Sequence, residues 1–84
     1  MSYYLIICRS LTYAQRTARA LERAGISGYI VRAPKNVAGE GCSHGVKVAE
    51  RRLAQALQVL NREGLAPKRV YVQDGNGGYQ EVTP

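Results

Sequence analysis

Residues 3–25 read YYLIICRSLTYAQRTARALERAG, and this stretch decides the fold class because its apolar spacing changes partway along. Tyr3–Cys8 is a continuous, β-prone apolar run, which predicts a central strand that is covered on at least one face. Ser10 follows as a suitable N-cap. Apolar residues then recur at helical spacing, so we predict a helix over Leu11–Ala24 that Gly25 ends.

The rest of the chain continues the alternation of strands and helices. We predict a strand over 26–33, a loop over 34–45, a short strand over 45–48, a helix over 49–63, a strand over 69–73 and a short edge strand over 79–82. The order β-α-β-β-α-β predicts an α+β, ferredoxin-like sandwich, in which two helices cover one face of a four-stranded antiparallel sheet. The first and third strands form the central pair. The other face is open or used in association, and residues 79–82 add a possible short extra C-terminal strand.

Composition indicates one small, basic, globular domain. The chain has 84 residues, of which 45% are apolar, and this length fits a single domain over residues 1–84. A domain this small has modest stability, which a homodimer would improve. Twelve Lys and Arg against six Asp and Glu give a net charge of +6. That excess attracts an acidic partner, or simply covers a solvated surface.

Two features predict a soluble protein with free thiols. The N-terminal apolar run is too short for a signal peptide, and no run approaches the roughly 20 apolar residues that a membrane span needs. We therefore expect no membrane partner. The chain has only two cysteines, Cys8 and Cys42, whereas small secreted domains usually carry more. This predicts a reducing, cytoplasmic location.

Cys42 is the residue with the clearest potential site chemistry. It lies between Gly41 and Ser43 in a glycine-rich loop, where small neighbours leave a sulfur atom accessible. A nearby cation lowers the pKa of a thiol and so favours the reactive thiolate. The alternative is a small apolar residue in a loop. The residues that would shape the loop are Gly41, His44 and Gly45, and the possible thiolate stabilisers are Lys35 and Lys47.

Cys8 ends the first strand, and we expect it to pack in the core as a small apolar residue. A Cys8–Cys42 disulfide is disfavoured, because we expect the loop before the third strand to lie at the opposite end of the sheet. The same expected separation argues against a metal site, since Cys42 and His44 alone supply too few ligands for structural zinc. We expect no metal and no cofactor.

Enzymatic activity and nucleic-acid binding are both weakly supported. The chain has one histidine and scattered acidic residues, which form no recognisable catalytic triad. RNA-recognition modules stack bases on aromatic side chains in their central strands, but the predicted third strand has no aromatic residue. Tyr4, Tyr29 and Tyr71 are the candidates for the open sheet face, where tyrosines also suit a dimer interface.

Four segments together resemble the putative selenium/sulfur carrier protein-like family, a group of small bacterial domains of unknown function. They are Ser10-Leu11-Thr12-Tyr13-Ala14, residues 20–26 (ALERAGI), Val31-Arg32-Ala33-Pro34-Lys35 and Gly41-Cys42. The resemblance implies that Cys42 holds a persulfide or selenosulfide, received from a donor such as a cysteine desulfurase and passed to an acceptor enzyme. Family members often have Cys-Gly here, whereas this chain has Cys42-Ser43-His44-Gly45. The alternatives are a non-catalytic protein-interaction or dimerisation module with an incidental cysteine and, third, an RNA-binding domain.

Overall fold

A computed structural model describes residues 3–32, 44–67, 69–73 and 78–82. Its elements are β1 (Tyr3–Cys8), α1 (Leu11–Arg23), β2 (Tyr29–Arg32), β3 (His44–Ala49), the 3₁₀ turn η1 (Glu50–Arg52), α3 (Leu53–Arg62), β4 (Arg69–Gln73) and β5 (Tyr79–Val82). The described residues therefore follow the order that the sequence predicts, and the last strand is the extra C-terminal one.

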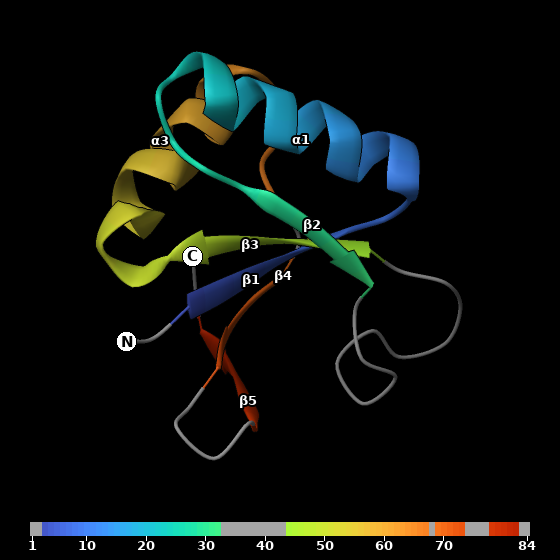
Figure 1. Ribbon diagram of the computed structural model, residues 1–84, viewed down its shortest axis with the longest axis vertical. Helices are drawn as coiled ribbons and strands as arrows, with labels where there is room; N and C mark the ends of the chain where they lie inside the picture. The colour runs from blue at the N-terminus through green and yellow to red at the C-terminus, as the bar shows by residue number, and fades with distance from the viewer. Residues whose placement is uncertain (1–2, 33–43, 68, 74–77, 83–84) are drawn as a thin grey trace.

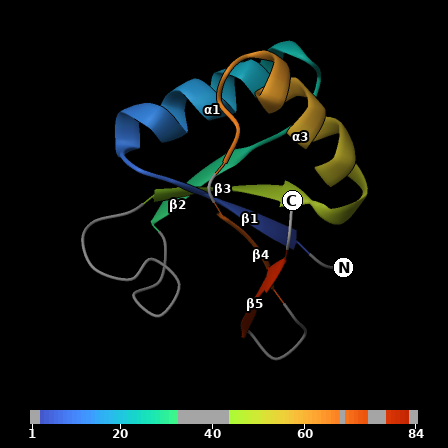
Figure 2. The same ribbon diagram turned by 180° about the vertical axis from the view of Figure 1, so that it is seen from behind.

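The strands form one antiparallel sheet with the order β2-β3-β1-β4-β5. The described helices α1 and α3 lie on the same side of this sheet, as two opposite views show (Figures 1 and 2). β1 and β3 are neighbours in its centre, with β2 at one border. The α+β, ferredoxin-like arrangement is confirmed, with β5 added beyond β4.

The core lies between the helices and one face of the sheet. Successive side chains of a strand point to opposite faces, and directly paired residues share a face. Ile6 is paired with Val46 on one side and Val70 on the other, and at most 1% of each is exposed. Leu21 of α1 and Leu60 of α3 are fully buried in the same cluster. The predicted apolar stripes of both helices therefore cover the centre of the sheet.

The described α-helices α1 and α3 end with the same hydrogen-bonded motif around a glycine. At the end of α1, Gly25 has a φ of 80°, and the Ile26 N–H donates to the Leu21 carbonyl at 2.9 Å. At the end of α3, Gly64 has a φ of 75°, and Leu65 donates to Leu60 in the same way. This is the Schellman motif, which a left-handed residue such as glycine makes possible.

The predicted second strand begins too early because Ile26 belongs to this cap. Its buried side chain packs with the core, while its backbone closes α1. The strand starts only at Tyr29. The second helix was also predicted to start too early: Ala49 still pairs with Tyr3 in the sheet, and η1 intervenes before α3. Ile26 thus belongs to the cap of α1 and not to β2, and Ala49 belongs to β3 and not to α3.

Gly45 leaves room for the side chain of Leu5 on the sheet face away from the helices. A Cβ atom added at Gly45 would come within 2.6 Å of Leu5 Cδ1 and 3.2 Å of the Ile6 carbonyl oxygen. We expect Gly45→Ala to lower the free energy of unfolding by about 1–3 kcal/mol, because such overpacking must displace a buried side chain. Urea unfolding measures the change.

A double-mutant cycle of Gly45→Ala with Leu5→Val isolates this contact. If the added Cβ atom collides with the Leu5 side chain, shortening that side chain relieves part of the strain, and the double variant loses less stability than the sum of the single changes. Additive losses would contradict the contact as the cause.

Candidate functional site

Three residues form a row across the sheet, at one end of its strands. β1 ends at Cys8, β3 begins at His44 and β2 ends at Arg32. His44 is paired directly with Cys8 on one side and with Arg32 on the other. Because paired residues share a face, all three side chains lie on the helix-covered side. Cys42 precedes the first residue of this row in β3, His44, by two residues in the sequence.

The expected separation of Cys8 from the loop before the third strand is wrong. Antiparallel pairing places the end of β1 beside the start of β3, so Cys8 lies opposite His44, two residues after Cys42 in the sequence. The sheet topology therefore does not exclude a Cys8–Cys42 disulfide or a metal shared by the two cysteines. Cys42 itself lies outside the described residues, together with Gly41 and Lys35.

Cys8 is a core thiol, as the sequence predicts. Only 4% of the residue is exposed, and its Sγ lies 3.7 Å from Thr17 Oγ1, within hydrogen-bond distance. Burial raises the pKa of the Cys8 thiol because the apolar core disfavours the charged thiolate, and the Thr17 hydroxyl opposes this rise. The thiolate form is therefore suppressed at this position, and Cys8 is poorly suited to accept an incoming group.

His44 carries a buried polar atom that has no hydrogen-bond partner among the described residues. Its Nδ1 is shielded from solvent and makes no hydrogen bond among the described residues. A buried polar atom without a partner costs about 1–3 kcal/mol, and such atoms often mark a site that something else completes. At the start of β3, His44 Nδ1 could therefore form one further hydrogen bond.

The other described candidates lie on the opposite face. Lys47 and Gly45 alternate with His44 along β3 and therefore face away from the helices. The Lys47 Nζ lies 4.4 Å from the centre of the Tyr3 ring, a cation–π contact. The structure therefore places His44 beside Cys8 but does not place Lys47 beside either of them.

Tyrosines gather on the face without helices. By strand alternation, Tyr4 shares the helix side with Ile6, and it packs against the core, so its expected place on the open face is wrong. The register instead places four others on the open face: Tyr3, Tyr29, Tyr71 and Tyr79. Tyr3 and Tyr79 were not among the predicted candidates, although the alternation with Ile6 and Cys8 already assigns Tyr3 to that face.

A shallow hollow lies between some of these rings. It is lined by Tyr3, Tyr4, Leu5, Val31, Lys47, Gln73 and Tyr79. On the open face, β3 contributes Gly45, Lys47 and Ala49, so no aromatic side chain extends from this central strand. Of the two central strands, β1 places Tyr3 beside the hollow but β3 places no aromatic side chain there, so only part of the base-stacking pattern of central strands is present.

Within the described ranges, no group of three or more His, Cys, Asp or Glu side chains is placed to hold a metal ion. Neither of the helices described is long and apolar enough to cross a membrane.

Comparison with known proteins identifies one family. The family model described as "Putative Se/S carrier protein-like" matches residues 3–72, which include all of the elements from β1 to the penultimate residue of β4 and the Cys42 segment. No curated protein is significantly similar to the chain, and no solved structure is.

Proposed function

Because the chain belongs to the putative Se/S carrier protein-like family, we propose that it carries sulfur or selenium on Cys42 for delivery to a partner enzyme. The match over residues 3–72 is the observation that carries this proposal. Of the two cysteines, Cys8 is buried in the core with a raised pKa. Cys42 is therefore the carrier thiol.

The surroundings of His44 support this assignment. Cys42 precedes His44 by two residues, which span at most about 7 Å of extended chain. The Nδ1 atom of His44, which has no hydrogen-bond partner in the described part of the chain, is thus within reach of the carrier segment. In this proposal, His44 forms a hydrogen bond to the loop when the bound sulfur or selenium is in place.

The transfer needs no oxidant, because it exchanges one sulfur–sulfur bond for another. The Cys42 thiolate attacks the terminal sulfur of a donor's cysteine persulfide. The bond between that sulfur and the donor's cysteine breaks, the donor leaves as a thiolate, and Cys42 becomes the persulfide. An acceptor thiolate then attacks the Cys42 persulfide by the same exchange and releases the Cys42 thiolate. The carrier itself is not an enzyme in this scheme.

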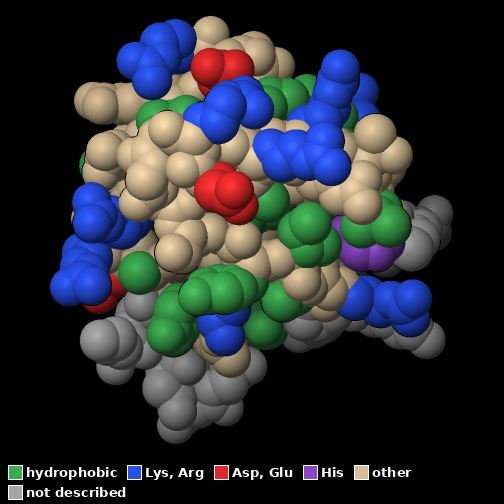
Figure 3. Space-filling model, turned by 45° about the horizontal axis from the view of Figure 1, so that its top comes forward, with side chains coloured by type: hydrophobic (Ala, Val, Ile, Leu, Met, Phe, Trp, Pro, Cys, Tyr) green, Lys and Arg blue, Asp and Glu red, His purple; other side chains and the backbone are tan. Residues whose placement is uncertain are grey.

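The basic surface supports docking to an acidic partner. Lys and Arg side chains are spread over the helix-covered side, with few acidic side chains between them (Figure 3). Charge complementarity of this kind mainly accelerates encounter. The donor and acceptor would therefore present acidic surfaces, and their association with this chain would slow as salt is added.

The proposal is tested by loading the intact chain with sulfur. After incubation with a cysteine desulfurase and cysteine, we expect the protein to gain about 32 Da, the mass of one sulfur atom held as a persulfide. Dithiothreitol should remove the added mass. Intact-mass spectrometry measures both steps.

Two single variants assign the sulfur to one thiol. Cys42→Ser should gain no mass, and Cys8→Ala should load as the wild type does. An unloaded wild-type chain, or equal loading of Cys42→Ser, would contradict the proposal.

A further inference from the structure

β2 is paired with β3 along its inner edge, and its outer edge combines backbone groups that no described strand pairs with and exposed apolar side chains. β2 is the last strand on this side, and no described residue pairs with its outer edge. Tyr29 is 63% exposed and Ile30 is 39% exposed. Together with Leu11, the first residue of α1, they are the exposed large apolar residues of the described chain. Such an edge is a template for another strand.

The flank of α1 above this edge carries apolar residues and an acidic residue, unlike the basic surface elsewhere on the helix side. Leu11, Ala18 and Glu22 share one side of the helix, because they are separated by seven and four residues. A Cβ atom at Gly28 would lie 4.0 Å from the Cα of Ala18, so this flank faces the start of β2. Glu22 and Gly28 also line a shallow hollow there. The flank thus carries an acidic group beside an open space.

We propose that two copies of the chain pair through β2, antiparallel and about a two-fold axis, to form one continuous sheet. An axis perpendicular to the sheet keeps the helices of both copies on the same side. With Ile30 on the axis, Ile30 lies opposite Ile30 of the second copy, and Tyr29 lies opposite its Val31. The paired side chains are then apolar on both faces of the sheet.

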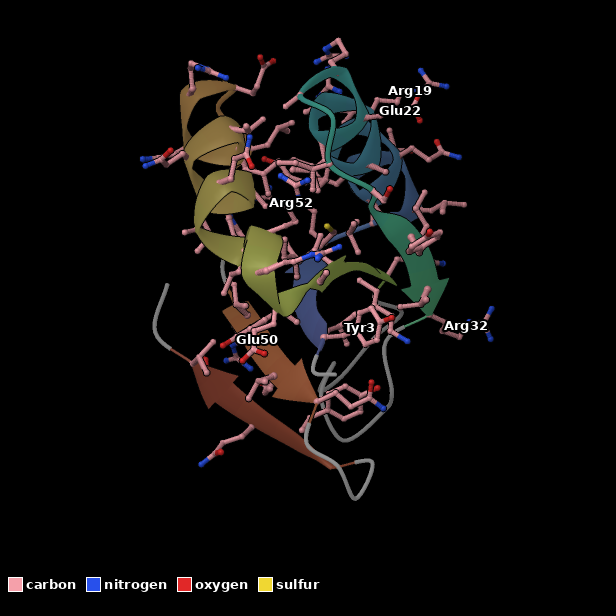
Figure 4. The ribbon with its side chains drawn as sticks, turned by 60° about the vertical axis from the view of Figure 1, so that its left-hand side comes forward. Tyr3, Arg19, Glu22, Arg32, Glu50 and Arg52 are labelled. Carbon is pink, nitrogen blue, oxygen red and sulfur yellow. The ribbon has the colours of Figure 1, made fainter. Side chains whose placement is uncertain are left out.

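Charge complementarity identifies a second copy as the occupant. In this register, Arg32 of one copy lies opposite Gly28 of the other, on the helix side, beside the hollow that contains Glu22. Glu22 and Arg32 are both exposed and both extend outward from the β2 side (Figure 4). The two-fold axis forms this Glu22–Arg32 pair twice. Moving the axis to Val31 would place Arg32 against Ile30 instead.

The opposite border of the sheet lacks these features. Gln80 and Glu81 of β5 are exposed and polar, and a charged side chain on an edge strand discourages pairing. Self-association is therefore assigned to β2. This inference does not depend on the sulfur-carrier proposal, because none of its residues lies in the Cys42 segment.

Sedimentation velocity of the full chain tests the proposal. Over a dilution series, the wild type should shift between a 9.2 kDa monomer and a particle of twice that mass. Glu22→Arg and Arg32→Glu should each raise the dimer dissociation constant by about tenfold or more, because each replaces two attractive pairs by two repulsive ones. The double variant Glu22→Arg/Arg32→Glu should restore much of the affinity, because it exchanges the charges of each pair.

Two further variants separate the edge from general charge effects. Ile30→Lys places two lysines together on the axis and should abolish the dimer, while circular dichroism checks that the variant is folded. Glu81→Arg makes the same charge change as Glu22→Arg on the β5 border and should leave the dissociation constant unchanged. A wild type that stays monomeric, or a dimer that Glu81→Arg weakens as much as Glu22→Arg does, would overturn the proposal. No rescue in the double variant would overturn the register.

Discussion

Replacing Ile6 with alanine is expected to lower the free energy of unfolding by about 3–4 kcal/mol, which is large for a domain of this size. Ile6 lies on the central strand, is 1% exposed and has Val46 and Val70 directly opposite it on the two neighbouring strands. Removing three carbon atoms there leaves a cavity that the flanking strands cannot close without breaking their pairing. Urea unfolding followed by circular dichroism measures the loss.

Ile30→Ala is the matched control. Val46 is paired with Ile6 on one side and with Ile30 on the other, so the two isoleucines lie in the same row of the sheet. Ile30, however, is on the edge strand β2 and is 39% exposed. Its truncation should cost less than about 1 kcal/mol at concentrations where the chain is monomeric. Equal costs for Ile6→Ala and Ile30→Ala would show that the core is not centred on β1.

The sequence predicts the architecture well because two periodicities agree with it. The Tyr3–Cys8 run is apolar throughout and becomes the central strand β1. The helical spacing after Ser10 begins where the structure places α1, and the Ser10 hydroxyl accepts a hydrogen bond from the Tyr13 N–H at 3.1 Å. A local hydrogen bond of this kind depends only on neighbouring residues, so a sequence reading can anticipate it.

The errors in element boundaries occur where an apolar residue serves two elements. Ile26 is as apolar and β-branched as a strand residue, but its N–H completes the cap of α1, and this geometry depends on the left-handed Gly25. The expectation for Tyr4 conflicts with strand alternation, because Cys8 was expected in the core and Tyr4, four residues before it on the same strand, lies on the same face.

The candidate site was predicted less completely than the fold. Sequence reasoning singled out His44 as a neighbour of Cys42, but the pairing of His44 with Cys8 and Arg32 follows from strand register. The lack of a partner for His44 Nδ1 among the described residues also appears only once the surrounding atoms are placed. Likewise, the closeness of Glu22 to the start of β2 depends on how α1 lies over the sheet.

The two thiols are expected to differ in reactivity by about 100-fold or more in the folded chain. Cys8 must be exposed by an opening of the core before a reagent reaches it. Burial also raises the pKa of Cys8, so its thiolate fraction is lower than that of an ordinary thiol at the same pH. Its alkylation should therefore keep rising with pH beyond the point at which an ordinary thiol has levelled off. For Cys42, the carrier proposal requires the opposite behaviour: this thiol must be accessible and ionised near neutral pH.

Native-state alkylation with iodoacetamide at pH 7, followed by tryptic peptide mapping, measures both rates in one sample. Trypsin separates the two cysteines, because Arg9 follows Cys8 and Lys35 and Lys47 flank Cys42. We predict rapid labelling of the Cys42 peptide, with the Cys8 peptide labelled at a comparable rate only after urea is added. Equal rates in the folded chain, or faster labelling of Cys8, would contradict the assignment of the carrier thiol to Cys42.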